Sequence, residues 1–391
     1  MKILYYLPSL YAPGGLERII VFKANYFAEH FPNCEVVVMT SEQRKQPIHF
    51  PLSNRVKHID LDVCIDYPFD QSAVTKALRF PFLYLKFKKK FIRALRAEEP
   101  DIVISTIRRE INFLPELRDG SYKLAEFHVT KNFYNPVVGR GIYSWINRFK
   151  DKLMVAKLRK MDKVIFLTEE EKIFWPDLQN LHVIPNPLVI NPQQFSNCEQ
   201  KQVIAVGRYM PQKGFDLLID GWAKVVKKHP DWTLKIYGEG MRKQLQNQID
   251  RLGIATQCKL EPTAHNIVKK YPESSIFVLS SRYEGFGMVV AEAMACGVPA
   301  VAFACPCGPR EIIQDGEDGI LVENGNVDQL ATSICMLIEN KDLRKSMGQK
   351  AQLHATRFRI ENIANQWKEL FNARVEAPDQ TQLRTGQKRI I

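Results

Sequence analysis

The chain has 391 residues, which is too long for one ordinary hydrophobic core and is typical of two domains. Its 45% hydrophobic and 25% charged residues are those of a soluble globular protein, and no apolar run approaches the roughly 20 residues that span a bilayer. The formal net charge of +12 leaves nucleic acid, an anionic membrane and phosphorylated ligands open as partners.

The first half of the chain alternates predicted strands with helical stretches. Residues 1–15 carry one lysine and are interrupted by Pro8 and Pro13, so they predict a first strand and not a signal peptide. A helix is expected at about residues 16–30. The predicted strands are residues 2–7, 35–40, 56–61, 101–105, 122–127 and 163–167. This alternation indicates a parallel, doubly wound sheet.

Two loops at the ends of these strands are candidate ligand contacts. Gly14 and Gly15 open the first helix, where free N–H groups and a bare backbone suit a phosphate, although any tight turn into a helix favours the same pair. His128 follows the strand at residues 122–127, at the edge where such sheets bind ligands. An isolated histidine can equally be structural.

A basic, aromatic stretch covers residues 79–96. If it is helical from about Leu83, one face carries Phe87, Phe91 and Leu95 and the other carries lysines and arginines, which is typical of a helix that binds an anionic membrane surface. The alternative is a solvated basic helix that packs its aromatic residues into the domain. The sequence contains no pattern typical of a nucleic-acid-binding module, so nucleic acid is not an expected partner.

A proline-rich segment separates the two halves. Residues 183–187 and the polar stretch at residues 193–201 predict a linker. The second half then begins with a strand at residues 202–206, whose following loop contains Arg208 and Lys213. At the end of a strand these two residues are well placed to bind a diphosphate, because the guanidinium of Arg208 offers a forked contact and the ammonium group of Lys213 a point charge. Further strands are expected at 233–237 and 276–279, and helices at 215–228, 288–295, 327–339, 341–356 and 360–374.

Residues 280–303 form an apolar, glycine-punctuated stretch with two glutamates, Glu284 and Glu292. Burying an ionised carboxylate among apolar residues costs free energy unless the carboxylate is hydrogen-bonded. Because we expect no partner close by in the sequence, both side chains are predicted to bind a ligand. Gly285 and Gly287 would let the backbone approach that ligand closely. The alternative is that Glu284 is a loop residue and Glu292 an exposed helix residue.

The spacing of the two glutamates restricts the chemistry. On one helix, residues eight apart lie about 12 Å apart along the axis, whereas a retaining glycosidase holds its two carboxyl groups about 5 Å apart. Separated carboxylates suit two separated hydroxyl-bearing groups, such as the sugar and the ribose of a nucleotide-sugar.

At these residues the chain resembles a known family. The E-x7-E pattern from Glu284 to Glu292, followed by M-A-C-G-V-P at residues 294–299, closely resembles the signature of retaining GT-B-fold glycosyltransferases of the family 4 type, the glycosyl transferases group 1. Four more segments resemble family elements in the correct order: G-G-x-E-R at 14–18, E-x-H at 126–128, I-P-N-P at 184–187 and V-G-R-x4-K-G at 206–214. The resemblance runs from about residue 3 to residue 371. Residues 262–266 depart from the family pattern, which leaves the nucleotide base undecided.

The resemblance implies a GT-B architecture, in which two Rossmann-like doubly wound parallel-sheet domains face each other across a cleft. Residues 1–187 would form the acceptor-side domain, with a helix at 357–374 packing back on it. Residues 188–200 would be the linker and residues 201–356 the nucleotide-sugar-binding domain. Residues 375–391 are polar without periodicity and are expected to be disordered.

The resemblance also implies roles for individual residues. Arg208 and Lys213 would stabilise the leaving diphosphate, together with amides around Gly15, while Glu284 holds the donor sugar and Glu292 the ribose. The implied catalytic residues are His128, which would position the anomeric region, and Arg208, Lys213 and Glu284. The implied donor-binding residues are Gly15, Arg208, Lys213, Gly285, Phe286, Gly287 and Glu292. No metal or other cofactor is expected.

The expected activity is retaining transfer of a hexose or N-acetylhexosamine from a nucleotide-sugar, with a UDP-sugar favoured, to a saccharide acceptor. A lipid-linked glycan, or a lipopolysaccharide or exopolysaccharide precursor of a bacterium, is the expected acceptor, and the expected location is cytoplasmic, with peripheral attachment to the inner face of the membrane through residues 79–96. Two alternatives stay open: a nucleotide-sugar epimerase of GT-B fold, and a non-catalytic nucleotide-sugar-binding protein. A dinucleotide-dependent dehydrogenase is disfavoured because the first turn lacks G-x-G-x-x-G.

Overall fold

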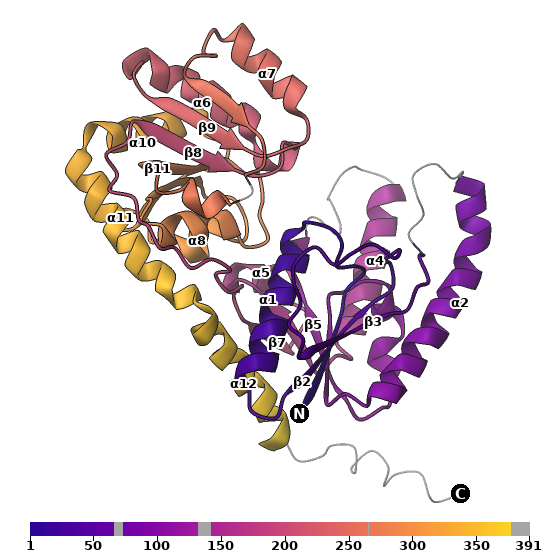
Figure 1. The fold of residues 1–391 in the computed structure, drawn as a ribbon. Coiled ribbons are helices and arrows are strands. Elements are labelled where there is room, and N and C mark those ends of the chain that lie inside the picture. Colours follow the sequence, from indigo (N-terminus) through magenta and orange to yellow (C-terminus); the bar gives the residue numbers. More distant parts are fainter. Residues whose placement is uncertain (66–72, 132–141, 265, 377–391) are drawn as a thin grey trace, which may run out of the picture.

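The computed structural model describes residues 1–65, 73–131, 142–264 and 266–376. They form two α/β domains that stand against each other in a V, and helix α12 runs from the second domain back along the first (Figure 1). The first sheet has seven strands and the second six, and every strand pair in both is parallel. The predicted class of two doubly wound parallel sheets is therefore confirmed.

The nine predicted strands lie close to their predicted positions, whereas the strands at residues 181–183, 258–261, 300–303 and 319–322 were not predicted. The first sheet contains β1 (Lys2–Tyr6), β2 (Glu35–Thr40), β3 (Val56–Asp60), β4 (Ile102–Ser105), β5 (Tyr122–Glu126), β6 (Lys163–Phe166) and β7 (Leu181–Val183). The second contains β8 (Gln202–Val206), β9 (Thr233–Tyr237), β10 (Cys258–Glu261), β11 (Ile276–Leu279), β12 (Ala300–Phe303) and β13 (Gly319–Val322).

Helices connect most of these strands. The α-helices are α1 (Gly15–His30), α2 (Ala73–Glu98), α4 (Ile142–Leu158), α5 (Glu169–Ile173), α6 (Phe215–Lys228), α7 (Arg242–Arg251), α8 (Met288–Ala295), α9 (Pro309–Ile312), α10 (Val327–Glu339), α11 (Lys341–Ala355) and α12 (Ile360–Glu376). Short 3₁₀ turns are η1 (Arg109–Asn112), η2 (Leu114–Glu116), η3 (Pro211–Lys213), η4 (Ile267–Lys269) and η5 (Thr356–Phe358). The tail expected at residues 375–391 lies outside the described residues from 377 onward.

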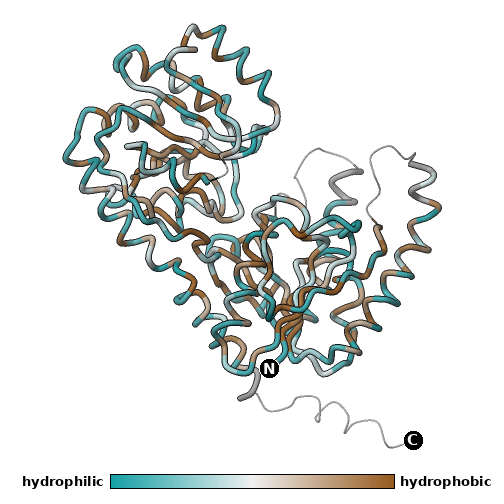
Figure 2. Tube along the Cα trace, viewed as in Figure 1, coloured by the Kyte–Doolittle hydropathy of each residue, from teal (hydrophilic) through white to brown (hydrophobic). Residues whose placement is uncertain are grey.

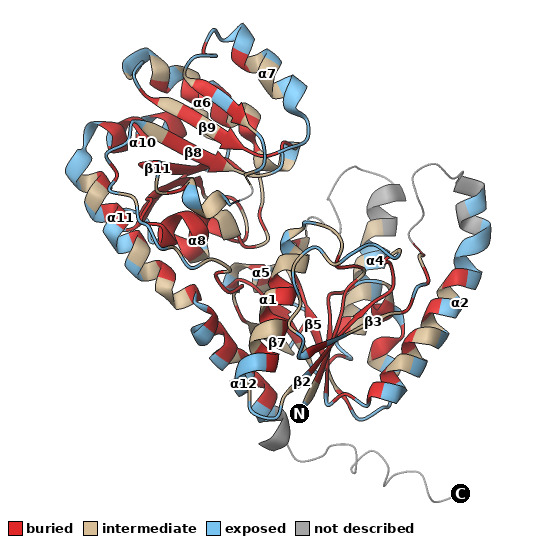
Figure 3. Ribbon diagram, in the orientation of Figure 1, coloured by how far each residue is buried: buried red, intermediate tan, exposed pale blue. Residues whose placement is uncertain are grey.

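Each sheet is covered by helices on both faces, as its nearly continuous apolar strands require. In the first domain α1 and α12 pack on one face and α2 and α4 on the other. In the second domain α6 and α10 cover one face and α8 and α11 the other. The strands are accordingly hydrophobic and buried, while the outer sides of the helices are exposed (Figures 2 and 3).

Helix α2 corrects one prediction. Its face with Phe87, Phe91 and Leu95 is at most 1% exposed, because it packs on the first sheet and does not face solvent. The face with Phe87 and Phe91 thus belongs to the core, as the alternative interpretation held, whereas other aromatic residues of the stretch are exposed. Large apolar side chains that are exposed among the described residues of this helix are Leu78, Phe80, Phe82 and Leu85.

The order of strands places the functional edge of each sheet. It is β3-β2-β1-β4-β5-β6-β7 in the first sheet and β10-β9-β8-β11-β12-β13 in the second. The chain therefore reverses direction across the sheet between β1 and β4, and again between β8 and β11. In open parallel sheets a crevice for ligands forms at this switch point, outside the carboxyl ends of the two strands.

The C-terminal helix contributes to the core of the first domain. Trp367 of α12 is 1% exposed and lies beside Phe27 of α1, with ring centroids 6.4 Å apart. We predict that Trp367→Ala lowers the free energy of unfolding by about 3–5 kcal/mol, since a large buried ring is lost and a cavity remains. Urea unfolding measures this change. Lys368→Ala, on the exposed side of the same helix, is the control, and an equal loss in both variants would contradict the packing role.

Candidate active site

The switch point of the second sheet gathers three of the predicted site residues. Arg208 follows β8, Lys213 ends η3, and Glu284 lies in the loop after β11. Lys213 Nζ donates to Glu284 Oε1 at 2.7 Å, and Ser281 Oγ donates to the same oxygen at 2.5 Å. The expectation that Glu284 lacks a partner nearby in sequence was therefore wrong, because Ser281 is three residues away. The buried carboxylate is satisfied before any ligand binds.

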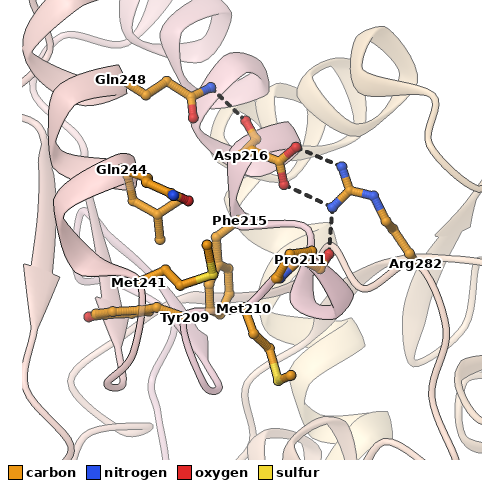
Figure 4. Close-up of a pocket in the computed structure, with 10 residues that line it drawn as sticks. Tyr209, Met210, Pro211, Phe215, Asp216, Met241, Gln244, Gln248 and Arg282 are labelled. Carbon is orange, nitrogen blue, oxygen red and sulfur yellow. Dashed lines mark hydrogen bonds and ion pairs between the residues drawn. The ribbon is translucent and has the colours of Figure 1, made fainter. Parts of the chain in front are cut away.

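A second ion pair fixes the turn that carries Lys213. The Arg282 guanidinium donates to both carboxylate oxygens of Asp216, at 2.9 and 2.6 Å, and to the carbonyl oxygen of Pro211 at 2.6 Å (Figure 4). These contacts join the β11 loop to η3 and to the first turn of α6, and they lower the pKa of Asp216. Arg282 therefore positions the phosphate-side loop, a role that the sequence did not reveal.

Glu292 lies at a separate position on α8. Its Oε1 accepts from Arg18 Nη1 at 3.0 Å, and its Oε2 accepts from the Tyr271 hydroxyl at 3.0 Å. Burial raises the pKa of Glu292, whereas Arg18 and Tyr271 lower it. Glu292 is 3% exposed, so the exposed-helix interpretation was wrong. Because Arg18 belongs to α1, this pair joins the two domains.

The glycines of the β11 loop act in part through the other domain. A Cβ on Gly285 would lie 2.5 Å from the carbonyl oxygen of His128, so only glycine permits this contact between the domains. Gly287 has φ of 92° and precedes α8, where a side chain would be strained. The Phe286 ring is 3% exposed and packs against Phe358, with centroids 5.4 Å apart. The Phe286 side chain is thus a core residue, and a donor contact at this position stays a prediction for its backbone.

The switch point of the first sheet faces this loop. Gly15 is exposed and has open space where a side chain would stand, so a ligand can approach its backbone. Burial raises the pKa of the neighbouring Glu17, whereas the charges of Arg108 and Arg208 lower it. Arg208 acts on this carboxyl although it comes from the other domain. Neither Glu17 nor Arg108 was predicted to be a site residue.

His128 is held by a buried ion pair beneath it. Lys23 of α1 donates to Glu126 Oε1, and His128 Nε2 lies 3.3 Å from the same oxygen, within ion-pair distance but outside good hydrogen-bond geometry. The ammonium group of Lys23 also lies 4.5 Å from the ring centre of Trp367. Burial by itself would raise the pKa of Glu126, but Lys23 and His128 lower it to about 2. The prediction from the sequence included His128 but missed Lys23, whose one signal was a lysine on the apolar side of a helix.

A further contact joins the two domains at the start of α5. The carboxylate of Glu311 accepts from the backbone N–H groups of Glu169 and Glu170, at 2.9 and 3.2 Å, and so caps the first turn of α5. Glu170 in turn accepts from the Cys307 N–H at 3.0 Å. The position of Glu311 is therefore structural.

The described residues contain neither a metal-binding cluster nor a membrane-spanning helix. No group of three or more His, Cys, Asp or Glu side chains there could hold a metal ion. No described helix is both long enough and apolar enough to cross a bilayer.

The sequence of the second domain matches a known family. Residues 189–354 match the family described as glycosyl transferases group 1. A glycosyltransferase of unknown specificity from Haemophilus influenzae is 36% identical over 212 residues, which cover 53% of this chain and 60% of that protein. The poly(ribitol-phosphate) α-N-acetylglucosaminyltransferase of Staphylococcus aureus is 31% identical over 232 residues, 57% of this chain and 46% of that protein.

The structural similarity to known proteins extends over both domains. The structure of S. aureus TarM, a variant bound to fondaparinux, α-GlcNAc-glycerol and UDP, superposes with a TM-score of 0.75 over 95% of this chain and 99% of that one, at 18% identity. This similarity confirms the expected GT-B architecture over the part of the chain that superposes. Four curated relatives are matched over 41–65% of their own length, so the chain spans less than two thirds of each.

The buried Glu126 carboxylate predicts an acid-dependent loss of stability. Its pKa is about 2 in the folded protein and near 4.5 when unfolded, so its contribution is complete above about pH 4.5 and is lost as the pH falls toward 2. Glu126→Gln cannot titrate, and we predict a smaller acid-dependent decrease in its free energy of unfolding. At pH 7 the variant is expected to be less stable by about 3–5 kcal/mol, because Lys23 is left buried and unpaired.

Urea unfolding between pH 2 and pH 7 tests this prediction, with the exposed Glu29→Gln as the control. If Glu126→Gln lost as much stability in acid as the wild-type protein, the buried ion pair would not be the source.

Proposed function

We propose that this protein is a retaining glycosyltransferase that transfers a sugar from a nucleoside-diphosphate sugar to an acceptor hydroxyl. One observation carries the proposal: the contact of Gly285 with His128 brings the Glu284 loop of one switch point against the first domain. The phosphate-side cations and the carboxylate for the donor sugar thus lie in one place, beside the histidine. A non-catalytic binding protein or an epimerase would have less need for these groups of both domains to lie together.

Electrostatics favours a diphosphate leaving group. Arg208 is exposed at the end of β8, and Lys213 Nζ lies within 2.7 Å of Glu284. When the bond from the anomeric carbon to the diphosphate breaks, negative charge develops on the phosphate oxygens, and fixed cations stabilise it in the transition state. Glu284 then has two functions, since it orients Lys213 and can accept hydrogen bonds from sugar hydroxyls. We propose that the reaction needs no metal, because these two cations supply the required charge.

The proposed reaction proceeds on one face of the sugar. The acceptor oxygen bonds to the anomeric carbon on the side from which the diphosphate leaves, and the acceptor proton passes to a leaving phosphate oxygen. The configuration is retained without a covalent intermediate. His128, fixed above Glu126, would position the anomeric region, and amides near Gly15 would contact the diphosphate.

Glu292 is proposed to bind the ribose. Its two oxygens point to different donors, Arg18 and Tyr271, and the Arg18 contact comes from the first domain. Ribose hydroxyls could take the place of the Arg18 contact because hydroxyl groups donate to a carboxylate with comparable geometry. Donor binding would then change a contact between the domains.

A UDP-sugar is the proposed donor, and TarM is a solved neighbour whose complex contains UDP. The proposed acceptor is a bacterial surface-glycan precursor that is lipid-linked or carries phosphate. Two relatives support this class by name, one a poly(ribitol-phosphate) and one a poly(glycerol-phosphate) glycosyltransferase.

We propose that the first domain binds the inner face of the membrane through the exposed ends of α2 and α4. Phe82 and Leu85 on α2 are 72% and 63% exposed, and Phe149 and Leu153 on α4 are 52% and 44% exposed. Exposed lysines accompany them, namely Lys86, Lys89, Lys150 and Lys152. Large exposed apolar side chains among basic residues are typical of an interfacial membrane contact. Lys88 and Lys90 are excluded from this surface, since Lys88 lies over the Phe113 ring and Lys90 donates to the Leu61 carbonyl.

The donor site predicts a selective loss of affinity in Glu292→Ala. The wild-type protein should be stabilised by several degrees by one nucleotide-sugar of a panel, since ligand binding to the folded state raises the melting temperature. Loss of charge-assisted hydrogen bonds to ribose should raise the Kd of that donor about 10- to 100-fold. Thermal shift and calorimetry measure both quantities.

Glu317→Ala, at an exposed position, is the control for this experiment. Equal donor affinity in the wild-type protein and in Glu292→Ala would exclude the ribose role. If no nucleotide-sugar stabilised the wild-type protein, the proposed donor class would be wrong.

The proposed membrane surface is tested by the double variant Phe82→Ser/Leu85→Ser. We expect its partitioning onto vesicles that contain phosphatidylglycerol to fall at least tenfold. Each apolar side chain that enters the bilayer would contribute about 1.5–3 kcal/mol to the free energy of membrane binding. Vesicle co-sedimentation measures the bound fraction. The matched control is Met336→Ser/Leu353→Ser, which removes exposed apolar residues from the second domain. Unchanged binding of the α2 variant would contradict this surface.

A further inference from the structure

The loop after β4 lies at the switch point of the first sheet but has no role in the proposed reaction. Strand β4 pairs with β1 on one side and with β5 on the other. Its loop therefore lies between the Gly15 loop and His128. The N–H and the hydroxyl of Thr106 both donate to the carbonyl oxygen of Tyr6, at 3.2 and 3.0 Å, which fixes the start of the loop to the end of β1.

The loop is held in a conformation that its sequence would not adopt alone. Ile107 has φ of 58°, which is strained for a β-branched residue. A buried carboxylate stabilises this turn: Glu110 Oε1 accepts from Ser105 Oγ at 2.5 Å and from the Arg108 N–H at 3.0 Å. Ser105 Oγ in turn accepts from the Ile107 N–H at 3.0 Å. The backbone of Arg108 is thus fixed, while its side chain is exposed.

The Arg108 guanidinium is available to bind an anion. Among the described residues, no acidic side chain lies within ion-pair distance of it. The next residue differs, because the Arg109 guanidinium lies 5.1 Å from the ring centre of Phe80. The charge of Arg108 also lowers the pKa of Glu17, as that of Arg208 does. This agrees with the strand order, which places the Arg108 loop between the Gly15 loop and His128.

We propose that Arg108 binds a phosphate group of the acceptor and so places the acceptor hydroxyl against the donor sugar. This inference rests on the proposed glycosyltransferase function and specifies the acceptor side of that site. The planar fork of a guanidinium matches two phosphate oxygens, and a fixed backbone limits the freedom that is lost on binding.

Arg108 suits the acceptor better than the donor. The proposed donor diphosphate is already matched by Arg208 and Lys213, which both belong to the second domain. Arg108 belongs to the first domain and is fixed to β1 and β4, so a ligand bound there stays with that domain. The acceptor anion and the donor anion would thus be bound by separate cations on separate domains.

The test uses sn-glycerol 3-phosphate as a minimal phosphate-bearing acceptor and glycerol as its uncharged control. Ligand-observed NMR titrations measure their Kd on the full chain, with and without saturating UDP. Wild-type protein should bind the phosphate ester and not glycerol at the same concentrations. Arg108→Ala should raise that Kd about tenfold, and Arg108→Lys should raise it less, since a point charge remains.

Arg118→Ala is the matched control, because Arg118 is an exposed arginine that precedes β5 at the opposite edge of the sheet. It should leave the Kd of glycerol 3-phosphate unchanged, and the Kd of UDP should be the same in Arg108→Ala and wild type. An unchanged Kd of glycerol 3-phosphate in Arg108→Ala, or no binding to wild type, would overturn the proposal. A weakened Kd of UDP in Arg108→Ala would also overturn it by assigning the residue to the donor site. A wild-type protein that binds no UDP would contradict the proposed function, while the titrations without UDP would still test Arg108.

Discussion

The reversal of strand order beside the first strand of each sheet determines where all the chemistry lies. The carboxyl ends of parallel strands lie at one edge of the sheet. Where the loops after two neighbouring strands lead in opposite directions, they separate and leave a crevice between them. In the first sheet these loops carry Gly15 and Arg108, and in the second they carry Lys213 and Glu284. Because the two edges face each other, residues far apart in sequence meet without any one segment containing a complete site.

Charge pairing makes this convergence stable in the absence of a ligand. The buried carboxylates Glu284, Glu292 and Glu126 are each bound by a cation, so none of them is an uncompensated charge. Two of these pairs fix side chains that we propose to bind the substrate. One of the two, Arg18 with Glu292, also joins the domains. A donor that binds Glu292 must therefore compensate, through its own hydrogen bonds, for the ion pair with Arg18 that it displaces.

The sequence predicted nine of the thirteen described strands and several second-domain loops, because their signals are local. The helix at residues 288–295 lies at its predicted bounds, since an apolar run follows a glycine turn. Helix α7 was missed because it is almost wholly polar, with Ile249 its one buried residue. The partner of Glu292 could not be predicted, since Arg18 is 274 residues away and only the packing of two domains brings them together. Arg108 had no signal either, because its importance comes from strand order.

Helix α12 has a consequence for the order in which the protein folds. Trp367, Leu370 and Phe371 complete the core of the first domain, although they follow the whole second domain in the chain. During synthesis the second domain can therefore close its core as soon as residues 341–355 have emerged, whereas the first domain exposes the apolar face of α1 until residues 360–376 follow. The domain made first is finished last, and its unfinished face is the surface that a chaperone would have to protect.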